Sequence, residues 1–254
     1  VFSSPVQLSP HTLYLRPRSD HKLTVQASFL TLSPPAEVVW RSDLYGNSIA
    51  IAYFNGTTTQ LDIVSELSVE TFPRSESQRR LLLETGTTQY SATEKRMLWA
   101  CIDQPRNTAD AVAAWIKRGA SGVQKGQYER LLECAARIRY EFDYRIRFEQ
   151  GLQPPAETLR LHSGTCRDFA GLMIAAARSL GCAARFVTGY VYTPNAAPGS
   201  SSPHAWAEVY IPAVGWIELD ATNGLVDDGD LIPVASAASG AELTPILGAF
   251  TGYG

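Results

Sequence analysis

Three residues have the side chains that nucleophilic catalysis on an acyl carbon requires: Cys166, His204 and Asp220. A thiol can attack the carbon, and an imidazole can accept its proton and later protonate the leaving amine. A carboxylate can fix the tautomer and orientation of the imidazole. We expect the backbone N–H of Cys166 to meet the oxyanion. Because these residue types occur in most proteins, the hypothesis depends on the elements that position them.

Cys166 stands at the head of a predicted helix. The apolar residues after it recur with a helical period: Phe169, Leu172, Met173, Ala176 and Leu180. Thr165 can cap this helix, Asp168 is a short version of the capping-box acid, and Gly181 can turn left-handed at the far end. The first turn of a helix has unpaired N–H groups and the positive end of the dipole, which stabilise an anion such as a thiolate.

The other three cysteines, Cys101, Cys134 and Cys182, lie among apolar neighbours and are interpreted as buried hydrophobic residues. No C-x-x-C pair occurs, so the spacing does not indicate a disulfide framework. A zinc site built from the three reactive residues is disfavoured, because no close ligand pair exists. We therefore expect neither a metal nor a cofactor.

His204 and Asp220 lie at the same end of a predicted hairpin, formed by strands 204–211 and 215–220. If the connection is residues 212–214, Asp220 stands opposite Trp206 and His204 is its diagonal neighbour on the same face. A four-residue connection would put the two on opposite faces. The three-residue register also sets Glu208 against Glu218, which is electrostatically unfavourable.

The first ninety residues are predicted to form a sandwich-like antiparallel β domain, in which no group of catalytic residues is visible. Alternating or β-rich segments occur at 23–29, 38–40, 49–53 and 61–72. The Asn55-Gly56 pair predicts a hairpin between the last two of them.

Residues 73–92 are interpreted as a connection, after which the composition favours helices at 93–101, 108–118, 127–140 and 156–161. A strand is predicted at 184–192. Helices followed by antiparallel strands predict an α+β fold. We therefore expect two domains, 1–90 and 91–254, the second with helices packed on an antiparallel sheet.

Composition excludes several classes of protein. The 254 residues carry 22 Lys+Arg against 25 Asp+Glu, a net charge of −3, so no basic field for nucleic acid is present. No apolar run approaches the roughly 20 residues of a membrane span, and the opening residues lack the pattern of a signal peptide. We expect a globular protein without a membrane partner, and the cytoplasm as its default compartment.

Four blocks of sequence, in this order, resemble the transglutaminase-like superfamily in its bacterial cysteine-peptidase branch. The blocks are Ala156-Glu-Thr-Leu, Gly164-Thr-Cys-Arg-Asp-Phe-Ala170, Leu180-Gly-x-x-Ala-Arg-Phe-Val-Thr-Gly-Tyr190 and His204-Ala-Trp-Ala-Glu-Val-Tyr-x-Pro-x-x-Gly-Trp-x-x-x-Asp-x-Thr-Asn223. The segment Leu8 to Arg18 is similar to the start of the β domain that precedes the core in that branch. This resemblance implies a papain-like α+β core, with Cys166, His204 and Asp220 matching the triad.

Further positions follow from the same resemblance. Tyr144 matches an aromatic position upstream of the nucleophile, which implies a site-lining residue or second oxyanion donor; the alternative is a core tyrosine with a satisfied hydroxyl. Thr165 and Trp206 are further expected site-lining residues. Val1 falls inside the first strand of the family, so we expect the natural start upstream.

The expected function is thiol acyl transfer on the amide bond of a peptide or protein, through a thioester at Cys166 that water hydrolyses. This describes a cysteine peptidase or amidase. One alternative is a protein-glutamine transglutaminase, in which a lysine amine accepts the acyl group and forms an isopeptide bond. The other alternative is a non-catalytic binding protein that retains the fold.

Overall fold

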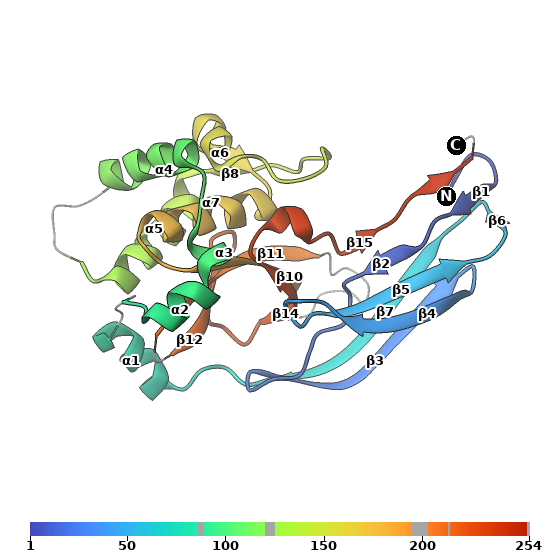
Figure 1. Ribbon diagram of the computed structural model, residues 1–254, viewed down its shortest axis with the longest axis horizontal. Helices are drawn as coiled ribbons and strands as arrows, with labels where there is room; N and C mark the ends of the chain where they lie inside the picture. Colours follow the sequence, from blue (N-terminus) through green and yellow to red (C-terminus); the bar gives the residue numbers. More distant parts are fainter. Residues whose placement is uncertain (86–88, 120–124, 195–202, 213, 253–254) are drawn as a thin grey trace.

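The computed structural model describes residues 1–85, 89–119, 125–194, 203–212 and 214–252. Figure 1 shows a part built of helices on a sheet and an elongated arm of strands, with both chain ends at the tip of the arm. Helices packed on antiparallel strands confirm the predicted α+β class. No helix among the described residues is long and apolar enough to cross a membrane.

The arm consists of short antiparallel sheets. Its strands are β1 (Val6–Leu8), β2 (His11–Leu13), β3 (Leu23–Ser33), β4 (Ala36–Ser42), β5 (Ser48–Phe54), β6 (Thr57–Thr58), β7 (Asp62–Thr71), β15 (Ile246–Leu247) and β16 (Phe250–Thr251). The orders are β15-β2-β5-β4, β16-β1-β6 and the pair β3-β7. Strands β15 and β16 follow the core in sequence, beyond the predicted division after residue 90, and pair with the arm strands β2 and β1.

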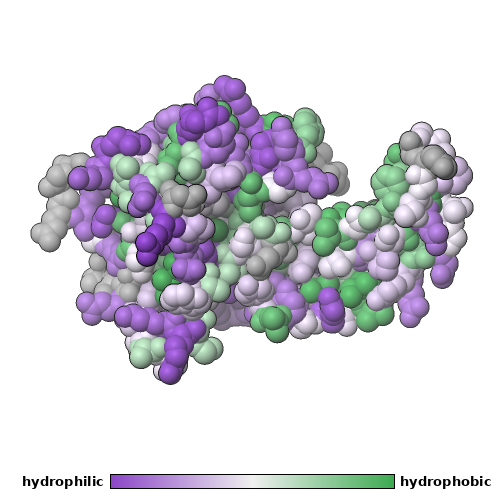
Figure 2. Space-filling model, turned by 45° about the horizontal axis from the view of Figure 1, so that its top comes forward, coloured by the Kyte–Doolittle hydropathy of each residue, from purple (hydrophilic) through white to green (hydrophobic). Residues whose placement is uncertain are grey.

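Apolar side chains gather on the surface of the arm, seen as green areas in Figure 2. Large hydrophobic side chains that are more than one third exposed on the strands of the arm include Phe29, Val39, Trp40, Tyr53 and Val64. Among the described residues, the buried cluster of the arm consists of Leu13, Leu15, Ala50 and Ala52, with partly buried side chains such as Leu30 and Phe54 packed against it. The arm thus has a small core, which leaves apolar strand residues at its surface.

The predicted hairpin at Asn55-Gly56 is wrong. The chain does turn there, and Gly56 adopts a φ of +75°. Strand β5, however, is already paired with β2 on one edge and β4 on the other, while β7 pairs with β3. Because both edges of β5 are taken, the two segments flanking the turn enter different sheets.

The helices are α1 (Glu76–Thr85), α2 (Ala92–Met97), α3 (Trp99–Ile102), α4 (Arg106–Gly119), α5 (Gln127–Glu141), α6 (Pro155–Leu161) and α7 (Cys166–Ser179), with a short 3₁₀ turn η1 (Gly240–Glu242). Helices α4 to α7 match the predicted segments to within two residues. The segment predicted as one helix over 93–101 is two, divided at Leu98. Helix α1 lies in the segment interpreted as a connection.

The central sheet has the order β13-β12-β11-β10-β14 and is antiparallel throughout. Its strands are β10 (Ala184–Val191), β11 (His204–Ile211), β12 (Gly215–Asp220), β13 (Leu225–Val226) and β14 (Leu231–Ala237). A small parallel pair, β8 (Asp143–Tyr144) and β9 (Ser163–Gly164), lies outside it.

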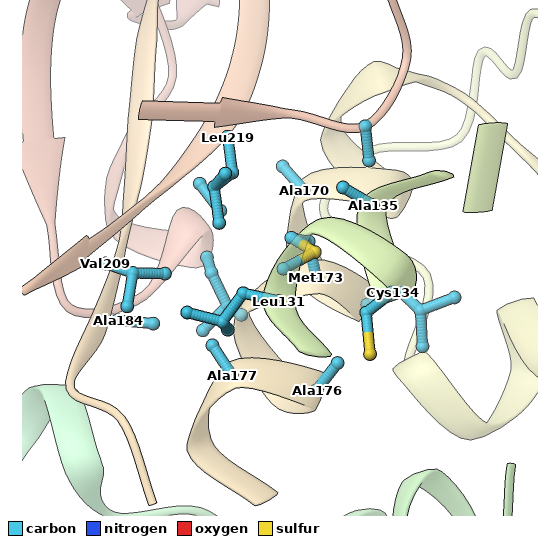
Figure 3. Close-up of a cluster of buried hydrophobic side chains, with 14 of the residues drawn as sticks. Leu131, Cys134, Ala135, Ala170, Met173, Ala176, Ala177, Ala184, Val209 and Leu219 are labelled. Atoms are coloured by element: carbon cyan, nitrogen blue, oxygen red, sulfur yellow. The ribbon is translucent and has the colours of Figure 1, made fainter. Parts of the chain in front are cut away.

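Helix α7 is the centre of the core. Figure 3 shows its small buried residues Ala170, Ala176 and Ala177 between α5 and the sheet, together with Met173. Small side chains on this helix allow close approach of its neighbours, and dense packing holds its ends in place. The core therefore fixes the amino terminus of α7, where Cys166 lies.

Charged and polar contacts hold the arm against the core. The Nζ of Lys22 in the arm lies 2.7 Å from an Asp227 carboxylate oxygen, and the Arg74 guanidinium binds the other oxygen of Asp227. Asn47 donates to the Ser236 carbonyl at 2.8 Å and accepts from the Ser236 N–H at 2.9 Å. The arm is thus attached at both β14 and the end of β13.

Candidate active site

Cys166 is the first residue of α7, as predicted. The backbone N–H and the hydroxyl of Thr165 both donate to Asp168 Oδ2, each at 2.9 Å. This is the capping contact expected from Thr165 and Asp168. Gly181 adopts a φ of +82° beyond the far end, also as predicted. The thiol is partly exposed in a turn whose N–H groups have no partner within the helix.

Asp168 is fully buried and fixes the loop before the helix. Arg147 donates to it from Nε at 3.1 Å and from Nη2 at 2.8 Å, and the Gln153 N–H donates at 2.8 Å. Burial alone would raise the pKa of Asp168, but the hydrogen bonds from Arg147, Thr165 and Gln153 outweigh burial and lower it. An ionised Asp168 therefore ties the segment around 147–153 to the end of α7.

The hairpin has the predicted three-residue connection. Ile211 pairs with Gly215 and Ala207 pairs with Leu219, so the next position along sets Trp206 opposite Asp220. The His204 imidazole reaches Asp220, with Nε2 2.9 Å from Oδ2.

The same register does bring Glu208 and Glu218 opposite each other. Each acid has a cation nearby: Arg185 lies 2.6 Å from Glu208 and Lys22 lies 3.6 Å from Glu218. Arg185 in β10 thus pairs with the Glu208 carboxylate, while burial and the neighbouring Glu208 raise the pKa of Glu218 to about 8, so that two like charges do not face each other at neutral pH.

Asp220 is 1% exposed and is held from several sides. Its Oδ1 accepts from the Thr222 N–H at 2.9 Å, and its Oδ2 accepts from the Asn223 amide at 2.8 Å. Burial would raise the pKa of Asp220, but its hydrogen bonds and the charge of His204 lower it. Asp220 is thus a fixed, ionised acceptor for the imidazole.

His204 faces Asp220 with one nitrogen and lines the same cavity as Cys166. Burial lowers the pKa of His204, but Asp220 and Cys166 outweigh burial and raise it to about 9. The Trp206 indole stacks on the imidazole, with ring centroids 6.1 Å apart and an interplanar angle of 26°. Trp206 is fully buried, so it supports the imidazole from behind.

Tyr144 lies beside the thiol. Its position in β8 is paired with Gly164 in β9, two residues before Cys166. The side chain is 54% exposed, which excludes a core tyrosine, and its ring packs edge-on against Phe169, three residues beyond Cys166. Burial and the Cys166 side chain raise the pKa of Tyr144, so the hydroxyl keeps its proton and can donate it to a hydrogen bond.

A cavity of about 280 Å³ opens next to Cys166, Thr165 and His204. Its apolar walls come from Leu152, Phe186, Pro203, Leu243 and Pro245. Two arginines, Arg147 and Arg167, also line it, and none of its described lining side chains is acidic. The segment 240–245, which leads back to the arm, supplies one wall.

The other cysteines are buried, as interpreted from the sequence, and form no disulfide among the described residues. In the part of the chain that the structure describes, no three His, Cys, Asp or Glu residues are grouped to hold a metal ion.

Sequence reasoning missed four residues around the site: Arg147, Gln153, Arg167 and Asn223. Arg147 and Gln153 reach the site through a loop that has no periodicity. Arg167 had a usable signal, because a cation in the first turn faces the positive end of the helix dipole and needs a compensating role.

Comparison with known proteins agrees with this geometry. Residues 104–221 match the transglutaminase-like superfamily core, and residues 1–70 match the bacterial transglutaminase-like N-terminal region. An uncharacterized protein of Mycobacterium leprae is 27% identical over 271 residues, covering 100% of this chain and 91% of that protein. One of Mycobacterium tuberculosis is 28% identical over 255 residues, covering 92% of this chain and 79% of that protein.

A crystal structure of a candidate cysteine protease from Cytophaga hutchinsonii has the same fold. It aligns with a TM-score of 0.72 at 21% identity, over 99% of this chain and 84% of that chain. The predicted papain-like core is confirmed. The predicted resemblance is thereby confirmed: residues 104–221 match the transglutaminase-like superfamily, and the bacterial transglutaminase-like N-terminal region precedes this core over residues 1–70.

Proposed function

We propose that the protein is a cysteine hydrolase that cleaves an amide bond of a peptide or protein substrate through a thioester at Cys166. The observation that carries the proposal is the buried His204–Asp220 hydrogen bond of 2.9 Å, with His204 and Cys166 lining the same cavity. A nucleophile, a base and a group that orients the base are the parts that this chemistry requires.

The roles of the imidazole nitrogens follow from the contacts. Because Nε2 is bound to Asp220, Nδ1 is the nitrogen that exchanges a proton with the thiol. Sγ gives its proton to Nδ1 and, as a thiolate, forms a bond to the amide carbon, whose carbonyl oxygen takes up the electron pair as an oxyanion. When the C–N bond breaks, Nδ1 returns the proton to the leaving amine. Water then attacks the thioester, its proton passes through His204 to the sulfur, and the C–S bond breaks, so amide and water give acid and amine.

Two donors can meet the oxyanion of each tetrahedral intermediate. The backbone N–H of Cys166 is free of the helical hydrogen-bond ladder at the first position of α7. The Tyr144 hydroxyl, which keeps its proton, approaches the thiol from the side of β8. We assign Tyr144 as the second donor, and Thr165 and Trp206 as residues that position Cys166 and His204.

The test is an amide-hydrolysis assay on a mixed panel of peptides and proteins, with and without a primary amine. Wild type is compared with Cys166→Ala and with Cys101→Ala, which removes a thiol outside the site. Release of ammonia or fragments that depends on Cys166 alone, without amine incorporation, is expected. Incorporation of the amine would instead indicate the crosslinking transglutaminase, and no Cys166-dependent turnover would leave a binding protein.

A further inference from the structure

The positive charge of the cavity is concentrated in one residue. Arg147 is neutralised, because two of its nitrogens donate to the buried carboxylate of Asp168. Arg167 is different: among the described residues, its hydrogen bonds go from Nη2 to the carbonyl oxygens of Arg147 and Glu149, at 3.3 and 2.6 Å. Carbonyl groups fix a guanidinium without cancelling its charge.

The charge of Arg167 is electrostatically unfavourable at this position unless an anion binds beside it. It follows Cys166 directly, in the first turn of α7, where a cation faces the positive end of the dipole. It lines the cavity, whose described lining side chains include no carboxylate. Nη1 and Nε also carry N–H donors, and each can donate to a carboxylate oxygen while Nη2 is held by the carbonyl groups.

We propose that Arg167 is a specificity-determining residue that binds a carboxylate of the substrate beside the scissile amide. The preferred substrates are then amides whose residue next to the cleaved bond carries an acidic group, with its apolar part against Leu152 and Phe186. This inference rests on the proposed function, because it takes Cys166 as the nucleophile.

The test compares two alkylating agents that differ only by a carboxylate, iodoacetate and iodoacetamide. In both reactions Sγ bonds to the methylene carbon and iodide leaves. The ratio of their rates at Cys166, divided by the same ratio for glutathione, reports attraction of the carboxylate. Arg167→Gln should lower this ratio on the order of tenfold, as expected for a charge-assisted hydrogen bond, with the iodoacetamide rate little changed.

The matched control is Arg145→Gln, which removes the same charge from a side chain that is 70% exposed and paired with Asp143. It should leave the ratio unchanged, and Arg167→Lys should retain most of it. An unchanged ratio in Arg167→Gln overturns the inference. A second measurement needs no variant: N-acetylglutamate should protect wild-type Cys166 from iodoacetamide better than N-acetylglutamine, and equal protection overturns the inference.

The two proposals fail in different ways. If iodoacetamide alkylates Cys166 no faster than an ordinary exposed thiol, the nucleophile itself is wrong. If Cys166 reacts selectively but shows no Arg167-dependent preference for the carboxylate reagent, only the specificity proposal is wrong.

Discussion

The Asp220 carboxylate sets the protonation state of His204. It is almost completely buried, accepts from two groups of the 222–223 turn and lies 2.9 Å from Nε2. A charge fixed in this way stabilises imidazolium at neutral pH, which is the form that can protonate a leaving amine.

Replacing Asp220 by Asn tests that role. Burial lowers the pKa of His204, but Asp220 and Cys166 outweigh burial and raise it to about 9. In the pH profile of kcat/KM, the decrease on the alkaline side should therefore lie near pH 9. In Asp220→Asn this alkaline decrease should shift to a pH that is lower by at least about one pH unit, and kcat should fall by about 10²–10⁴-fold. A pH–rate profile measures both. An alkaline decrease that stays at the same pH would contradict the assignment.

Replacing Tyr144 by Phe tests the second oxyanion donor. Loss of one donor should lower kcat by about 10²–10³-fold and leave KM nearly unchanged, because the oxyanion exists only beyond the ground state. The alkylation rate of Cys166 should change little, since that reaction forms no oxyanion. A variant with raised KM and normal kcat would show that Tyr144 binds substrate instead.

The placement of Cys166, His204 and Asp220 near one another could be predicted because it depends on local rules. A helix start placed Cys166, and a three-residue connection aligned His204 with Asp220. Arg147 could not be predicted, because its contact with Asp168 spans 21 residues through irregular chain. The role of Tyr144 beside the thiol came from the resemblance rather than from the pattern.

At the scale of elements, two glycines show how the sheet and α7 fit together. A Cβ on Gly189 would lie 2.1 Å from the Ile232 carbonyl oxygen and 2.7 Å from the Trp206 ring. A Cβ on Gly171, in the middle of α7, would meet Leu152 at an ordinary 3.5 Å. Strand β14 thus passes β10, with a shift of register at Thr188/Gly189, only because Gly189 has no side chain.

The pair Gly189→Ala and Gly171→Ala should therefore have opposite effects on the free energy of unfolding. Gly189→Ala should lower it by about 1–3 kcal/mol through overpacking against backbone. Gly171→Ala should raise it by about 0.5–1 kcal/mol, since alanine favours a helix interior. Urea unfolding measures both, and destabilisation of equal size in the two variants would count against this packing.

Elements with a strong period were predicted well, and those that depend on tertiary partners were not. Helix α5 (127–141) and strand β11 (204–211) match their predictions closely. Strand β14 (231–237) was missed, because its pairing partner β10 lies about forty residues earlier in the chain. The Asn55-Gly56 hairpin failed because β5 had a partner on each edge, which local turn chemistry does not reveal.

At the scale of the whole molecule, buried charged residues lie where the arm contacts the core. Glu218 is 3% exposed, faces Glu208 and has one oxygen without a hydrogen-bond partner among the described residues. Lys22 lies 3.6 Å away but is closer to Asp227, at 2.7 Å. Burial raises the pKa of Glu218 to about 8, aided by Glu208 and Asp227 and opposed by Lys22.

This predicts a pH dependence of stability. Between an ordinary pKa of 4.5 and about 8, folded Glu218 keeps a proton that the unfolded chain has lost, so its contribution is full below pH 4.5 and is lost as pH rises toward 8. The slope is at most about 1.4 kcal/mol per pH unit. Glu218→Gln should remove it in urea unfolding at pH 5 to 8, with Glu66→Gln on the arm as control. Equal slopes in wild type and Glu218→Gln would refute the prediction.

The central claim, a thioester at Cys166, can be tested by acid quench and peptide mapping after brief incubation with a p-nitrophenyl ester. The account predicts that one acyl group is found on Cys166, is removed by hydroxylamine and forms far more slowly in His204→Ala. The opposite result, with Cys166 unmodified or acyl groups scattered over Cys101, Cys134 and Cys182 as well, would contradict it.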